Sequence, residues 1–67
     1  MNRDSLKGQW MQLKGTLRNN WGKLTDDDIE LIGGDADVLI GKLQERYGMA
    51  REAAEKELEE WQKFVKI

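Results

Sequence analysis

The stretch LKGQWMQLKGTLRNNW, residues 6–21, decides the fold. Its large apolar residues are separated by four, three, four and four positions, which is the spacing of one face of an α-helix. At 100° per residue they fall within an arc of about 80°, and the two tryptophans differ by only about 20°. We therefore predict one continuous helix that buries this face, with Gly22 closing it in the left-handed conformation. The apolar residues of the face are Leu6, Trp10, Leu13, Leu17 and Trp21.

The segment 25–34 predicts a second, short helix. Thr25 offers a side-chain oxygen to the amides that follow it, and the three acids at 26–28 suit the positive end of a helix dipole. The pair Gly33-Gly34 ends the helix, because glycine is a common residue of turns. The apolar residues expected on this helix are Ile29, Leu31 and Ile32.

Capping residues and apolar spacing predict two further helices. Asp35 caps one that runs to Tyr47 with Gly48 as its stop, and the last begins near Met49 or Ala50. Both keep the helical period in their apolar positions. These positions are Ala36, Leu39, Ile40, Leu43 and Tyr47 in the third helix, and Ala50, Ala54, Leu58, Trp61 and Val65 in the fourth.

The composition indicates a small all-α protein and excludes much chemistry. The 67 residues contain no Pro, Cys or His, so disulfides, thiolate nucleophiles, imidazole bases and the usual zinc ligands are absent. We predict a compact single-domain bundle of four or five short helices over residues 1–67, anchored mainly by its three Trp, one Tyr and one Phe. We expect no catalytic, cofactor-binding or metal-binding residues. The longest unbroken apolar stretch covers residues 38–40, and the N-terminus has no signal-peptide core, so we expect a cytoplasmic monomer without a membrane segment.

The charge is distributed unevenly along the chain. Residues 1–24 hold five basic residues and one acidic residue, a net charge of +4, whereas residues 25–67 hold six basic and twelve acidic residues, a net charge of −6. On a continuous first helix, four of the basic residues fall within about 60° of one another and form a basic stripe. The stripe is a solvated flank, a docking site for the acidic half, or a phosphate-binding surface with steep salt dependence. It consists of Arg3, Lys7, Lys14 and Arg18, our candidate interaction surface.

The acidic residues suggest structural roles before functional ones. The aspartates of the middle segment do not have the spacing of an EF-hand, so helix capping explains them better than a divalent cation does. Glu57 is the one carboxylate inside the apolar arc of the last helix, and we expect a boundary residue paired with a Lys or Arg; the alternative is a functional acid. The aspartates in question are Asp26, Asp27, Asp28, Asp35 and Asp37.

Three blocks of sequence resemble a known family. They are Gly8-x-Trp10-x-Gln12-x-Lys14-Gly15, Trp21-Gly22-Lys23-Leu24-Thr25-Asp26-Asp27-Asp28, and Gly41-Lys42-x-Gln44-x-x-Tyr47-Gly48. Together with the spacing between them, these blocks are similar to the CsbD-like family of bacterial general stress proteins. The resemblance implies a small cytoplasmic protein, abundant under stress, with a four- to five-helix fold similar to the SAM-domain-like group and no established catalytic activity.

Two functional hypotheses follow. The first is a non-enzymatic stress-response protein of unknown molecular activity that acts by abundance or through a protein partner. The alternative is an anion-binding or nucleic-acid-binding module that uses the basic stripe.

Overall fold

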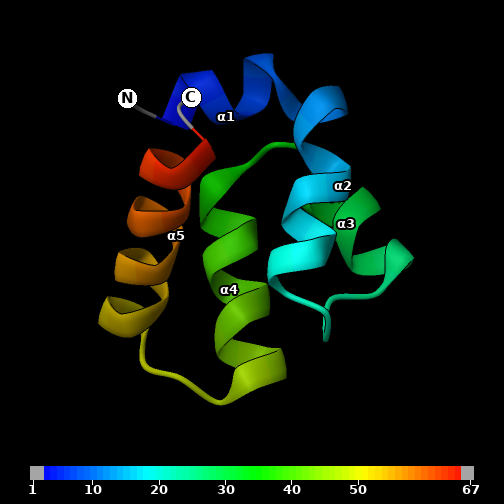
Figure 1. Ribbon diagram of the computed structural model, residues 1–67. Helices are drawn as coiled ribbons and strands as arrows, with labels where there is room; N and C mark the ends of the chain where they lie inside the picture. The colour runs from blue at the N-terminus through cyan, green and yellow to red at the C-terminus, as the bar shows by residue number, and fades with distance from the viewer. Residues whose placement is uncertain (1–2, 66–67) are drawn as a thin grey trace.

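The computed structural model describes residues 3–65, with side chains described from residue 6 onward. This part of the chain is built from helices joined by short turns and contains no strand, which confirms the all-α class (Figure 1). The helices are α1 (Arg3–Gly8), α2 (Trp10–Asn20), α3 (Asp26–Ile32), α4 (Ala36–Tyr47) and α5 (Arg51–Val65).

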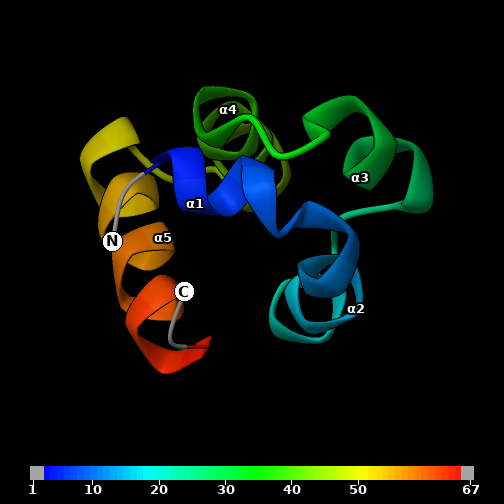
Figure 2. The ribbon, with the colours of Figure 1, turned by 90° about the horizontal axis from the view of Figure 1, so that it is seen from above.

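The continuous first helix that we predicted is wrong, because the chain breaks at Gln9. Gln9 has φ −114° and ψ 16°, and its carbonyl accepts hydrogen bonds from the amides of Gln12 and Leu13 at 3.0 and 3.1 Å, so a new helix starts there. Gly8, the last residue of α1, favours the break because glycine has a low helix propensity. Figures 1 and 2 show α1 lying across one end of the molecule and α2 running in a different direction. The five apolar residues of the predicted face are nevertheless all buried.

The predicted helix starts are confirmed in atomic detail. Thr25 and Asp28 form a reciprocal capping box: the Asp28 amide donates to Thr25 Oγ1 at 3.1 Å, and the Thr25 amide donates to Asp28 Oδ2 at 3.1 Å. Asp35 caps α4 by accepting from the amides of Asp37 and Val38 at 2.9 and 3.4 Å. Each cap satisfies donors that a helix start otherwise leaves without a partner.

The helix ends follow the prediction at two of three positions. Gly33 and Gly48 adopt the left-handed conformation, with φ of 51° and 64°, and close α3 and α4. The predicted left-handed closure at Gly22 is wrong. Trp21 ends α2 instead, with φ −122° and ψ 80°, and its amide donates to the carbonyl of Leu17 at 2.9 Å. Because Trp21 already provides this last bond, the following glycine does not need a positive φ.

The core is organised around α4, which packs against α5, α3 and α1. Trp21, at the end of α2, meets Trp61 of α5, with ring centroids 5.3 Å apart and planes tilted by 53°. Such tilted aromatic pairs are favourable beyond their buried area. The two tryptophans therefore join the ends of α2 and α5. The core residues are Leu6, Trp10, Leu13, Leu17, Trp21, Leu24, Ile29, Ile32, Ala36, Leu39, Ile40, Leu43, Ala54, Leu58 and Trp61.

Two large apolar residues are exposed: Leu31, which we predicted on the second helix, and Phe64, which we expected among the anchors of the core. Leu31 is 66% exposed and Phe64 is 79% exposed. At 100° per residue, Leu31 points about 100° away from Ile32, and Phe64 lies about 60° outside the arc that Trp61 and its buried neighbours occupy. Ala50 is also exposed, because it precedes α5. The helical period was correct in these segments, but the buried arc is narrower than we assumed.

Candidate interaction surface

The break at Gln9 divides the basic stripe between two helices. Lys7 lies on α1, whereas Lys14 and Arg18 lie on α2. Arg3 is the first described residue of α1, and its side chain lies outside the described part of the structure. The predicted alignment assumed one straight helix, so the structure replaces a single stripe by two separate groups.

Lys14 and Arg18 face the acidic helix α3. Lys14 Nζ lies 3.1 Å from Glu30 Oε1, and Arg18 donates to the carboxylate of Asp26. These exposed ion pairs contribute little stability, in the range of about 0–1 kcal/mol each. The two ion pairs bring acidic residues of segment 25–67 next to basic residues of segment 1–24. A phosphate that binds here has to displace two carboxylates.

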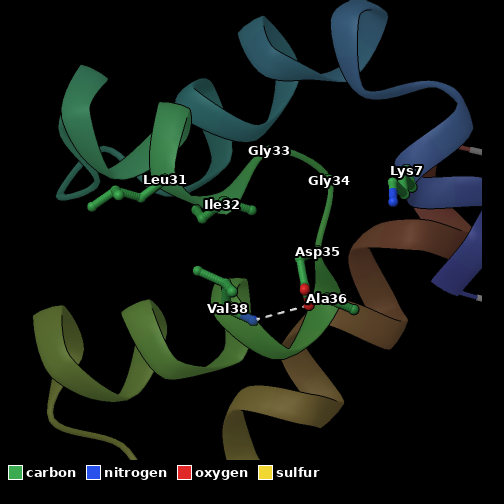
Figure 3. Close-up of a pocket in the computed structure, with 8 residues that line it drawn as sticks. All are labelled: Lys7, Leu31, Ile32, Gly33, Gly34, Asp35, Ala36 and Val38. Carbon is green, nitrogen blue, oxygen red and sulfur yellow. Dashed lines mark hydrogen bonds between the residues drawn. The ribbon is translucent and has the colours of Figure 1, made fainter.

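Lys7 lies at a different place, beside a cleft between α1 and the α3–α4 turn. Within residues 3–65 its ammonium makes no ion pair, in contrast to Lys14 and Arg18. The cleft has a volume of about 450 Å³, which is in the range of small binding sites. Its lining residues are Lys7, Leu31, Ile32, Gly33, Gly34, Asp35, Ala36 and Val38, and we call it the Gly34 cleft (Figure 3).

The Gly34 cleft combines apolar side chains with about as much polar surface. Figure 3 shows Leu31 and Ile32 extending from α3 and Val38 from α4, with the glycine turn between the two helices. Asp35 contributes a carboxylate, but its Oδ1 accepts from the amides at the start of α4. Lys7 is therefore the charged group of the lining that has no partner in the described structure.

Gly34 holds this cleft in shape through a close contact. Its φ of 89° lies in the region that favours glycine. A Cβ atom at this position would lie 2.8 Å from Lys7 Cα and 3.3 Å from Trp10 Cβ. The α3–α4 turn and α1 can approach this closely only because residue 34 has no side chain.

A buried ion pair on the other side of α3 was not predicted. Asp28 is 2% exposed, and its carboxylate accepts from Arg46 Nε at 2.8 Å and Nη2 at 3.0 Å. Lys42 Nζ lies 3.4 Å from the same group. The Arg46 guanidinium, with help from the Thr25 amide, holds the pKa of Asp28 well below its usual range, although burial opposes this. Hydrogen bonding to Asp28 likewise raises the pKa of Arg46.

The sequence contained a partial signal for this ion pair. A Thr followed three residues later by an acid is a capping-box pattern, and Lys42 and Arg46 are four residues apart on one helix face. Neither pattern says that the two elements meet. Because Asp28 already has three partners, we assign this cluster a structural role.

The remaining acids are dispersed. Asp37 pairs with Arg51 at 3.1 Å, and no group of acids in the described residues could hold a metal ion. Glu57 accepts a hydrogen bond from Trp21 Nε1 at 3.2 Å, so the Lys or Arg partner that we expected is wrong. None of the helices described between residues 3 and 65 is sufficiently long and apolar to cross a membrane.

Comparison with known proteins agrees with the three sequence blocks. The sequence model of the CsbD-like family matches residues 4–56. The chain belongs to the CsbD-like family. This CsbD-like chain is 52% identical over 62 residues to the UPF0337 protein YjbJ of Escherichia coli (strain K12). The aligned region covers 92% of the chain and 90% of YjbJ. It is 53% identical over 62 residues to a UPF0337 protein of Pectobacterium atrosepticum, and the alignment covers 92% of the chain and 90% of that protein. It is 51% identical over 61 residues to a UPF0337 protein of Pseudomonas aeruginosa, and the alignment covers 91% of the chain and 94% of that protein.

Proposed function

We propose that this CsbD-like chain is a non-enzymatic, cytoplasmic stress-response protein that binds a protein partner through the Gly34 cleft. The whole chain acts as one monomeric domain in this proposal. The occupant is a partner segment that places an apolar side chain between Leu31 and Val38 and a carboxylate near Lys7. Family membership supports the stress-response role, and the Gly34 cleft supports the partner.

One observation carries the choice of surface: Leu31 is 66% exposed on the wall of a cleft whose cation has no partner in the described residues. Large apolar side chains at the edge of a concave site are typical of protein contacts. An unpaired ammonium beside them favours a segment of opposite charge. The cleft thus combines an apolar wall with one charge that selects the partner.

The alternative, a phosphate-binding or nucleic-acid-binding module, has less support. Such binding relies on several cations acting together. Lys14 and Arg18 already face Glu30 and Asp26, which leaves Lys7 as the unpaired member of the stripe among the described side chains. Acids next to the cations weaken the attraction for a phosphate backbone.

Photo-crosslinking in stressed cells tests the proposal. A crosslinking amino acid replaces Leu31 in one variant and Met11 in a matched control, since Met11 is 80% exposed on α2 and does not line the Gly34 cleft. We expect a discrete crosslinked species from position 31, its loss on Lys7→Glu, and none from position 11. The same pattern from both positions, or no product from either, contradicts the proposal.

A titration tests the alternative in parallel. Fluorescence of the tryptophans is followed while single-stranded or double-stranded nucleic acid is added at low and moderate salt. Binding that falls steeply with salt and is lost in Lys7→Glu/Lys14→Glu would favour the alternative over the partner hypothesis.

A further inference from the structure

A second concave surface runs along α5. Two neighbouring hollows, of about 310 and 380 Å³, share Glu57 and Glu60, and we consider them together as one groove. Figures 1 and 2 place α5 on the opposite side of α4 from α3, so this groove is separate from the Gly34 cleft. We call it the α5 groove. Its lining residues are Asn20, Met49, Ala53, Lys56, Glu57, Glu60, Trp61 and Phe64.

Apolar side chains lie at both ends of the α5 groove. Phe64 is 79% exposed at one end, and Met49 lies half-buried at the other. Ala53 and the edge of Trp61 lie between them along the same helix face. An exposed aromatic at one end and a flexible methionine at the other, with a concave surface between them, are suited to receive apolar side chains.

The charged part of the α5 groove is acidic and not neutralised. Glu60 makes no ion pair within residues 3–65, and Glu57 accepts only from the neutral indole of Trp21. On the flanks of the same helix the acids are paired, as in Arg51 with Glu55 at 3.6 Å and Lys63 with Glu59 at 3.7 Å. The groove therefore presents two carboxylates against the single ammonium of Lys56.

One buried donor beneath the α5 groove has no acceptor. Trp61 is 3% exposed, and its Nε1 is buried without any hydrogen-bond partner in the structure. A buried N–H without an acceptor is costly, and buried tryptophans usually find one. Trp61 forms part of the groove lining, but its Nε1 lies beneath the surface, so a bound segment contacts the ring and not this nitrogen.

We propose that the α5 groove binds a basic amphipathic helical segment of a partner protein. The segment's apolar side chains pack on Phe64 and Met49, and its Lys or Arg side chains pair with Glu57 and Glu60. This surface goes beyond the partner site at the Gly34 cleft, because the two differ in place and in the charge that they select. Half of its lining residues lie after residue 56, outside the part of the chain that the family model matches.

Fluorescence anisotropy of a dye-labelled peptide tests the proposal with the full chain. The probe is a helical Leu/Lys peptide about as long as α5, and its control has Glu in place of every Lys. We expect saturable binding of the Leu/Lys peptide only. Glu57→Gln/Glu60→Gln should weaken it by about tenfold or more, since charge pairs at an interface steer and stabilise a complex. The matched control Glu55→Gln/Glu59→Gln, on the same helix outside the groove, should bind as the native chain does.

Three further results decide the proposal. Phe64→Ser should weaken binding, and Leu31→Asp should leave it unchanged, so that failure of the Gly34 cleft and failure of the α5 groove are told apart. Circular dichroism shows that each variant is folded. Equal binding of both peptides, equal losses in the two double variants, or displacement by spermine at the concentration of the peptide would overturn the proposal in favour of nonspecific or small-cation binding.

Discussion

Replacing Asp28 by Asn tests the ion pair that anchors α3 to α4. Asn has nearly the same shape and can still accept from the Thr25 amide, but it carries no charge. It cannot accept both guanidinium bonds, at 2.8 and 3.0 Å, through two carboxylate oxygens. Lys42, 3.4 Å from Asp28, also loses its counter-charge. The change thus removes the electrostatic part of the contact and leaves the packing in place.

The expected loss of stability follows from the burial of Asp28. A hydrogen bond to a charged group contributes about 1.5–3 kcal/mol, and removing one partner of a buried pair costs about 3–5 kcal/mol. Arg46 reaches solvent, so its charge can be rehydrated and the lower part of these ranges applies. We expect Asp28→Asn to lower the free energy of unfolding by about 2–3 kcal/mol. For a domain of this size the Tm falls by about 4–8 °C for each kcal/mol.

The loss should depend on pH with a definite sign. The pKa of Asp28 is depressed in the folded state relative to about 3.9 in the unfolded chain. Its stabilisation is therefore fully present above pH 4 and decreases as the pH falls below that value toward the folded-state pKa. The difference between the native chain and Asp28→Asn should shrink over the same interval.

Denaturant unfolding followed by tryptophan fluorescence measures both effects. The matched control is Asp27→Asn, because Asp27 lies in the same first turn but is exposed and makes no ion pair within the described residues. It should lose only its interaction with the helix dipole, about 0.3–1 kcal/mol. If Asp28→Asn costs no more than Asp27→Asn at pH 7, the buried ion pair is not a source of stability and our reasoning is refuted.

Two other predictions concern packing. Gly34→Ala should destabilise the fold by about 2–4 kcal/mol, because φ is 89° and the new Cβ would lie 2.8 Å from Lys7 Cα. The control Gly15→Ala, in an open position within α2, should stabilise the fold by up to about 1 kcal/mol, and thermal melts of the two variants compare these effects. Phe64→Ser should change the free energy of unfolding by less than about 0.5 kcal/mol, and a loss of several kcal/mol in a urea titration would place Phe64 in the core after all.

Local signals in the sequence were sufficient for most helix boundaries. The caps at Thr25 and Asp35 and the left-handed stop at Gly48 depend on a few neighbouring residues, so they can be recognised without knowing the fold. The break at Gln9 was missed for a related reason. Apolar spacing continues through it unchanged, and spacing alone cannot distinguish one helix from two that bury the same kind of face.

The candidate surface was harder to predict than the fold. Placing Lys7, Lys14 and Arg18 in one stripe required a straight helix, and the break sends Lys7 to the Gly34 cleft while the other two meet α3. The unpaired state of Glu60 depends on where α5 lies in the assembled molecule. Neighbours that are distant in sequence decide these features, and a single sequence does not specify them.

Asp28 both caps α3 and pairs with Arg46 of α4, and these two roles affect how the protein unfolds. A helix of seven residues is too short to persist alone in water. The carboxylate that completes the cap of α3 is also the one that fastens this helix to Arg46 of α4. Nucleating the short helix and docking it are consequently a single event, and α3 has no separate opening step by which it could unwind while its contact with α4 survives. The two helices therefore constitute one cooperative unit of unfolding.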